Sequence, residues 1–460
     1  MPDFHANAAK LGTEKVGRLL LNYSIPSIVS MIVVSLYNIV DRVFIGQGVG
    51  AIAISGLALT FPLMTLVTAV GTLIGVGASA RMSIVLGMKD LPWARNILGN
   101  AFFLTFILSA ALVVPALIFL DPILAFFGGS EQTIPYARGY LLIVIPGSVF
   151  TNLSFNFSGL MRASGYPVKS MVTILIGVVL NVILDPIFIF GMGLGIRGGA
   201  IATVISMFVS TVFVMTHFFN KSSFVHFEKG AFRLKGRIIR NIVSIGLSPF
   251  LMNIAAAMVN VIMNNRLVLY GGDLAIGAYG IINSYGILVV MCVMGLCQGM
   301  QPIMGYNYGE GKIKRMKDTL RLTIRVAVIF MSVGFVVCEL FPAQLAAAFT
   351  SDEELIRLTV SGLRIGFAAF PLIGFQIVVT IFFLSIGKAG QSIFMSLTRQ
   401  VIFLMPLLYL LSGWWGLEGV WAAMPASDAA AFVIAVFFLI GAKKYFYPKA
   451  SVRKAALKEV

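Results

Sequence analysis

The chain has 460 residues, of which 59% are hydrophobic and only 11% are charged, and its mean hydropathy is +0.96. Soluble globular proteins carry about 25% charged residues, so this composition excludes a large soluble protein and indicates an all-α integral membrane protein. The formal net charge of +16 suggests a nucleic-acid partner at first sight, but the basic residues are sorted by membrane side instead.

Apolar runs of about 20 residues recur along the chain and predict twelve transmembrane helices. The 34 Lys and Arg fall in the N-terminus, the C-terminus and the even-numbered connections, except for Arg42, Arg138, Arg197, Arg266, Arg357 and Arg364. This positive-inside bias predicts cytoplasmic termini, and we expect a bacterial-type cytoplasmic membrane. The predicted spans are 17–46, 53–80, 96–120, 134–158, 168–191, 198–219, 239–269, 275–304, 318–345, 355–386, 391–412 and 418–441.

The two halves of the chain resemble each other. The matches predict an internal duplication, with an N-terminal lobe at 1–219, a cytoplasmic linker at 220–238, a C-terminal lobe at 239–441 and a basic cytoplasmic tail at 442–460. Six spans per half make the halves parallel repeats, related by a pseudo-two-fold axis along the membrane normal. Chance similarity between Gly- and Ala-rich stretches is the alternative. Arg42 matches Arg266 at an offset of 224, Gly165 matches Gly387 at 222, and Gly195 matches Gly416 at 221.

In the first half of the chain, two aspartates lie inside predicted spans, where a charge is costly and marks a functional site. Asp41, Asp185 and Thr203 each lie about six residues, or roughly 9 Å, below the outer boundary of their helix. Asn181 precedes Asp185 by four residues, and Tyr37 stands in the same relation to Asp41, so each pair shares a helix face. These residues are predicted to lie at one depth.

Two carboxylates, an amide and a hydroxyl can surround a hard cation such as Na⁺, or they can share a proton. Alternatively, Asp41 pairs with Arg42 or a neighbouring helix and only fixes packing. Pro26 in the first span and Pro186 after Asp185 each remove a backbone hydrogen bond. The resulting kinks are either static or part of a gate.

The second half has no acid at the positions that match Asp41 and Asp185. Its polar residues predict a neutral polar cavity instead. Asp428, in the last span, either lines that cavity or pairs with Arg364 or Arg399. The neutral candidates for the cavity are Asn260, Asn264, Gln298, Gln301 and Gln376.

On these segments the chain resembles the multidrug and toxic compound extrusion (MATE) family, over essentially all twelve spans. The resemblance implies two six-helix lobes in a V-shaped fold and the exchange of Na⁺ or H⁺ for organic, often cationic, drugs. The segments that carry it are 37–46, Asn181-x-x-x-Asp185-Pro186, the glycine-rich stretch 195–203 that ends at Thr203, and 298–307, which contains Gln298 and Gln301.

The resemblance also implies site residues. In the DinF-like type of the family, the N-lobe cation site uses residues that match Asp41, Asn181, Asp185 and Thr203, and the proline that bends the first helix matches Pro26. The NorM-like branch carries C-lobe carboxylates in its seventh and tenth helices. This chain has Asn260, Asn264 and Gln376 there, so coupling through a C-lobe carboxylate is not expected unless Asp428 substitutes.

We therefore expect a monomeric secondary transporter that expels amphipathic organic cations across the lipid bilayer, with no cofactor beyond a bound Na⁺. A flippase for lipid-linked precursors is the close alternative, but it should have a strongly cationic cavity, and intramembrane Lys and Arg are sparse. An intramembrane enzyme would need a metal cluster or a nucleophile with its base, and neither pattern occurs in the sequence. No phosphate-binding loop of the Walker type is present either, so ATP hydrolysis is not expected.

Overall fold

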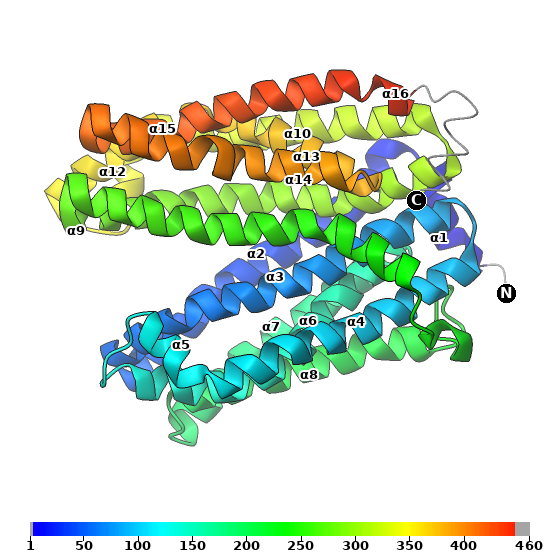
Figure 1. The fold of residues 1–460 in the computed structure, drawn as a ribbon, viewed down its shortest axis with the longest axis horizontal. Coiled ribbons are helices and arrows are strands. Elements are labelled where there is room, and N and C mark those ends of the chain that lie inside the picture. Colours follow the sequence, from blue (N-terminus) through cyan, green and yellow to red (C-terminus); the bar gives the residue numbers. More distant parts are fainter. Residues whose placement is uncertain (1–2, 447–460) are drawn as a thin grey trace. The chain divides into compact units, whose positions relative to one another are not determined.

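The computed structural model describes residues 3–446, without the side chains at 3–7, 38–39, 42–43, 51, 229 and 443–444. The described chain is almost entirely helical and contains no strand, so the predicted all-α fold is confirmed (Figure 1). From residue 447 onward, the predicted basic tail lies outside the described residues.

The helices follow one another with short connections. In the first half they are α1 (Asp3–Thr13), α2 (Val16–Val49), α3 (Ala51–Gly87), α4 (Leu91–Ile118), α5 (Leu120–Phe126), α6 (Ile134–Ala163), α7 (Pro167–Pro186), the π-helix η1 (Ile187–Gly191), α8 (Ile196–Phe219) and the short 3₁₀ helix η2 (Lys229–Phe232). The second half contains α9 (Gly236–Glu310), α10 (Ile313–Leu340), α11 (Pro342–Ala347), α12 (Glu353–Gly366), α13 (Phe370–Ser385), α14 (Ala389–Leu397), the π-helix η3 (Thr398–Leu404), α15 (Met405–Gly441) and α16 (Lys443–Phe446).

Nine helical segments of the described chain are long and apolar enough to cross a membrane, and the bent pair α12 and α13 makes a tenth. The 75 residues of α9 would extend about 110 Å as one straight helix, against a hydrocarbon core of about 30 Å. This helix breaks at Gly272, where φ is 63°, and α15 breaks in the same way at Gly416, where φ is 57°. Each of the two broken segments therefore provides two spans, which gives the twelve predicted.

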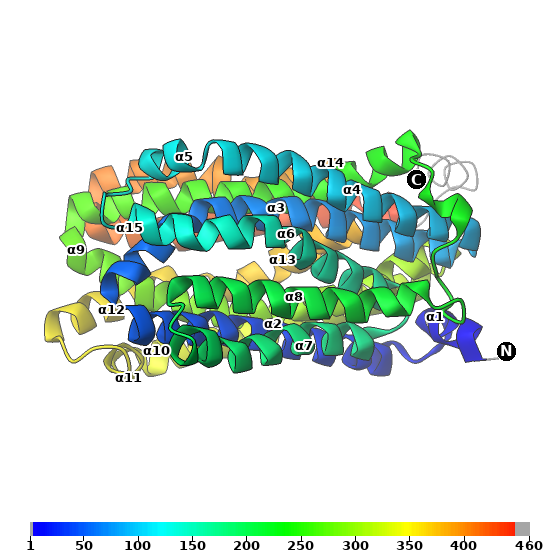
Figure 2. The same cartoon turned by 90° about the horizontal axis from the view of Figure 1, so that it is seen from below.

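By its contacts the chain divides into two compact units, and unit 1 comprises the residues up to Glu14 together with Val29–Phe250. At its centre α6 packs against α3, α4, α7 and α8, and Figure 2 shows α7 and α8 side by side. Polar bonds hold α6 in place: Asn152 and Asn156 donate to Ser109 and Thr105 of α4 at 3.2 and 3.1 Å. Such bonds and small residues take the place of hydrophobic packing between helices in lipid.

Unit 2 comprises Lys15–Ile28 and the residues from Leu251 onward. Its helix α13 packs against α10 and α15, and these three run side by side in Figure 1. Helices α12 and α13 meet at an angle of 54°, with Pro371 in the first turn of α13. Because proline has no N–H, the chain can bend there without losing a further hydrogen bond. The predicted span 355–386 is therefore a broken one.

Helices α2 and α9 each contribute to both units. The first part of α2 belongs to unit 2, where Ser24 Oγ donates to the Leu296 carbonyl of α9 at 3.4 Å. The first part of α9 belongs to unit 1, where Gly246 lies so close to α3 that a Cβ would stand 1.7 Å from the Leu73 carbonyl oxygen. Each unit therefore includes the beginning of a long helix from the other half of the sequence.

The backbone repeats the internal duplication predicted from the sequence. Residues with positive φ recur at nearly constant offsets in the two halves, and they lie where helices end. The π-helices η1 and η3 each fall within the fifth predicted span of their half, but not at matching positions, because at an offset of 222 Ile187 falls on Tyr409, beyond the end of η3. Equivalent turns in equivalent places support duplication over chance similarity. The matching positions are Gly50 and Gly272, Lys89 and Gly311, Gly165 and Gly387, and Gly195 and Gly416.

One helix was not predicted. The segment before the first span is polar, yet it forms α1, whose Ala8 and Leu11 are buried. Two apolar residues on one face give too weak a pattern to predict a helix, so packing within unit 1 decides the structure there.

The close approach of α9 to α3 predicts the effect of Gly246→Ala. The added methyl group would overlap the Leu73 carbonyl, so the backbones must separate, and we expect a loss of about 1–3 kcal/mol in the free energy of unfolding. Thermal unfolding of the purified protein in detergent, followed by circular dichroism, would measure it. Gly236→Ala is the matched control, because nothing lies within 4 Å of its Cβ position. Equal unfolding temperatures for the two variants would contradict the packing described.

Candidate functional site

The two intramembrane aspartates of the first half meet inside unit 1. Asp41 comes from α2 and Asp185 from the end of α7, and their carboxyl groups hydrogen-bond each other. Asp41 is 8% exposed and Asp185 is fully buried. Two carboxylates in contact cannot both stay ionised at low dielectric unless a cation lies with them. The pair therefore requires either a shared proton or a bound cation.

Asn181 and Thr203 complete the polar group around Asp185. With its amide oriented by its partners, Asn181 donates from Nδ2 to Asp185 Oδ2 at 2.9 Å. Its oxygen accepts from the Thr203 N–H at 3.1 Å and from Thr203 Oγ1 at 3.3 Å. The structure thus brings together all four residues that the depth argument grouped: Asp41, Asn181, Asp185 and Thr203.

Two tyrosines belong to the same cluster. The Tyr37 hydroxyl hydrogen-bonds Thr203, and both Tyr140 of α6 and the two aspartates act on it electrostatically. Tyr140 was missed by the sequence analysis, although it lies six residues after Ile134, at the depth of the other members. Counting depth on all six predicted spans of the first half, not only on those with acids, would have found it.

The two prolines occupy different surroundings. Pro186 ends α7 immediately after Asp185, and the chain continues as the π-helix η1, a form often found at functional sites. Pro26 lies within α2, in the part of that helix that belongs to unit 2. The side chain of Arg42, the alternative partner of Asp41, lies outside the described residues.

An apolar cluster covers one side of the polar group. Ile45 lies four residues after Asp41, Ile189 four after Asp185, and Ala200 three before Thr203, and all three are buried in the same cluster. On each of these three segments, an apolar residue therefore lies one helical turn from the polar residue, on the side of the predicted outer end. Water and ions that approach from that end would have to pass between these side chains.

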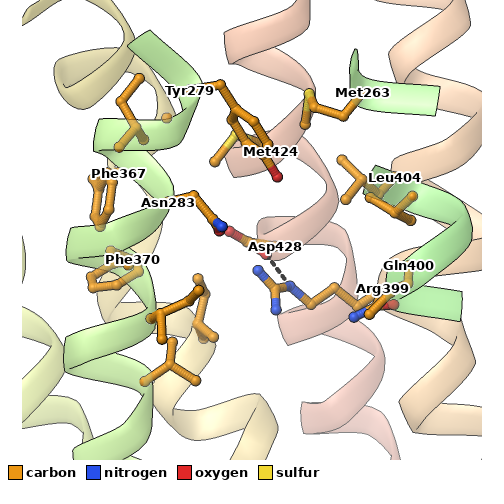
Figure 3. Close-up of a pocket in the computed structure, with 18 of the residues that line it drawn as sticks. Met263, Tyr279, Asn283, Phe367, Phe370, Arg399, Gln400, Leu404, Met424 and Asp428 are labelled. Carbon is orange, nitrogen blue, oxygen red and sulfur yellow. Dashed lines mark hydrogen bonds and ion pairs between the residues drawn. The ribbon is translucent and has the colours of Figure 1, made fainter. Parts of the chain in front are cut away.

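Unit 2 contains a separate cavity of about 310 Å³, which Figure 3 shows. Its polar residues come from α9, η3 and α15. Arg399 Nε donates to Asp428 Oδ1 at 2.5 Å, and the Tyr279 hydroxyl donates to Asn260 Oδ1 at 3.2 Å. Asn283 and Gln400 also line the cavity, and apolar side chains form most of the remaining wall, among them Phe367, Phe370, Met263, Met291 and Met424.

This cavity corrects the expectation of a neutral site. Asn260 and Asp428 line it, and Asp428 also pairs with Arg399, so the cavity contains a buried ion pair. Asn264 is exposed and is not part of the wall. Three predicted glutamines are absent from the wall as well. Gln298 and Gln301 follow the last lining residue of α9, Met291, by about two turns or more, and Gln376 instead donates to the Met395 carbonyl at 3.2 Å.

Comparison with known proteins identifies the family. The MatE family model matches residues 26–187 and 249–410. The multidrug export protein MepA of Staphylococcus aureus (strain MRSA252) is 29% identical over 433 residues, which cover 92% of this chain and 94% of MepA.

Solved structures agree with this match. The MATE multidrug transporter DinF-BH, whose structure was solved in complex with a ligand, is 35% identical, covers 95% of this chain and 98% of its own, and has a TM-score of 0.88. An outward-facing MATE family transporter of the MOP superfamily is 23% identical with a TM-score of 0.89 over 98% of both chains, which shows the shared fold. Because the family model matches more than half of the sequence, the chain belongs to the MatE family, the multidrug and toxic compound extrusion transporters, and it is a multi-pass membrane transporter rather than an enzyme.

Proposed function

We propose that this protein is a secondary multidrug exporter that exchanges Na⁺ or H⁺ for amphipathic organic compounds, many of them cationic, by alternating access. The observation that carries the proposal is the Asp41–Asp185 contact, because a buried carboxyl pair must take up a proton or a cation. The names of two relatives, a multidrug export protein and a multidrug transporter solved with a ligand, support the substrate class.

In the proposed cycle, the carboxyl pair takes up Na⁺ or H⁺ from the outside. Asn181 and Thr203 orient Asp185, and with the two aspartates they offer the oxygen ligands that Na⁺ prefers. Exchange follows only if the two states of the transporter bind the cation and the drug with unequal affinity. Bending of α2 near Pro26 is the proposed difference between the states, as in the DinF-like type.

The apolar cluster around Ile45, Ile189 and Ala200 would close the outer path in one of these states. The transporter is proposed to act as a monomer in a bacterial cytoplasmic membrane, with both termini in the cytoplasm. The flippase alternative needs a strongly cationic cavity for pyrophosphate, whereas the described wall of the unit 2 cavity contains a single basic residue, Arg399.

The proposal predicts that Asp41→Asn uncouples transport. Removal of one carboxyl leaves no acid pair, so export of a fluorescent cation from proteoliposomes, driven by separate Na⁺ and pH gradients, should fall at least about fivefold. Asp121→Asn is the control, because that aspartate lies at the surface beside Arg138. Full gradient-driven export by the Asp41 variant would refute the proposal, and the gradient that drives the unmodified protein identifies the coupling ion.

A second prediction concerns Asn181→Leu. Loss of the amide leaves the Asp185 and Thr203 partners unsatisfied in a buried place, which should cost about 1–3 kcal/mol of stability and weaken coupling. Thermal unfolding and gradient-driven export would be measured together. Val179→Leu, an exposed position two residues earlier on α7, should change neither. An Asn181 variant with unchanged stability and coupling would exclude the orienting role.

A further inference from the structure

We propose that the cavity of unit 2 is a binding site for amphipathic organic acids, in which Arg399 binds the carboxylate or another anionic group of the ligand. This inference concerns equilibrium binding to a site that the cation exchange does not use. It can therefore fail or succeed separately from the proposed function.

The two charges of the ion pair are unequally accessible. The side chain of Asp428 is 2% exposed, whereas that of Arg399 is 29% exposed. Figure 3 shows the guanidinium projecting across the cavity toward the side that carries Phe370 and Asn283. A guanidinium has five N–H donors, and the bond to Asp428 uses Nε. Neither Nη group hydrogen-bonds another described residue, so both can donate to a ligand. The accessible charge of the cavity is the positive one.

The rest of the wall suits a flat apolar body. The rings of Phe367 and Phe370 lie 4.2 Å apart, and the flexible Met263, Met291 and Met424 line the same space. A volume of about 310 Å³ is at the lower end for small-molecule pockets, which favours a ligand with one or two rings. Methionine adapts to varied shapes, so the wall would tolerate different ring systems.

The burial order of the pair decides which ligand charge is preferred. A cationic ligand would meet Arg399 first, and it could reach Asp428 only by separating a buried ion pair, which is strongly unfavourable. An anionic ligand can accept from the Nη groups while the pair stays intact, as guanidinium groups bind carboxylates with two parallel bonds. A neutral ligand lacks the negative charge that would strengthen its hydrogen bonds with the Nη groups. The cavity of unit 2 therefore favours an anionic ligand, whereas the paired carboxyl groups of unit 1 favour a cation.

The backbone around Arg399 also departs from regular structure. Arg399 and Gln400 lie in the π-helix η3, and both line the cavity. Single π-helical turns inside α-helices are frequent at functional sites. The other π-helix of the described chain, η1, also lies beside a candidate site, because it begins two residues after Asp185, although the two π-helices are not at matching positions of the repeat.

The test compares three probes that share one ring system: naphthylacetate, its methyl ester and naphthylmethylammonium. Calorimetric titration into the full protein in nanodiscs should give naphthylacetate at least about tenfold tighter binding than either of the others, the effect expected of charge-assisted hydrogen bonds. Arg399→Gln combined with Asp428→Asn removes both charges, so this variant should bind all three probes alike. Arg399→Lys keeps the charge without the two-pronged donor group and should lose part of the preference.

Two further variants keep the result interpretable if the double variant does not fold. Asn283→Phe fills the cavity and leaves the ion pair in place, so it should abolish the binding of naphthylacetate. Lys388→Gln removes a positive charge at the residue before α14, outside the wall, and should change nothing. Naphthylacetate that binds no tighter than its methyl ester, or an acid preference that survives in the double variant, would overturn the proposal.

Discussion

The contact between the carboxyl groups of Asp41 and Asp185 is the constraint on which the structure of unit 1 depends. Two buried carboxyl groups in contact are unfavourable unless they share a proton or a cation. Hydrogen bonds from the neighbouring residues nevertheless hold them together. Asn181 and Thr203 fix the orientation of Asp185, Tyr37 joins them through Thr203, and Tyr140 of α6 interacts electrostatically with Tyr37. Because the repulsion between two ionised carboxylates is unfavourable, the pair favours the uptake of a proton or a cation.

The helix that carries Asp41 also belongs to unit 2. Its first part, with Ser24 and Pro26, packs in unit 2, and its second part supplies Asp41 to unit 1. One continuous helix therefore connects the acidic site to the other unit through the backbone. Helix α9 is likewise divided between the units, because its beginning packs in unit 1 and the rest belongs to unit 2. The duplication that produced the two halves is thus visible both in their turns and in how they share helices.

The Asp41–Asp185 pair of unit 1 and the Asp428–Arg399 pair of unit 2 differ in the signs of their charges. In unit 1 two acids meet, while in unit 2 an acid is covered by an arginine that faces a cavity with aromatic walls. The two halves share the positions of their turns but not their buried charges. Equivalent frameworks can therefore hold buried charges of different kinds.

The sequence alone determined the twelve spans, because the length and apolarity of a span are local properties. It also grouped Asp41, Asn181, Asp185 and Thr203, because the fixed helical rise converts residue number into depth. It did not determine which faces of the helices meet, since that depends on side-chain packing between segments far apart in the chain. Only the tertiary structure could therefore place Tyr140 in the cluster, exclude Asn264 from the cavity wall, and show that Asp428 is buried beneath Arg399.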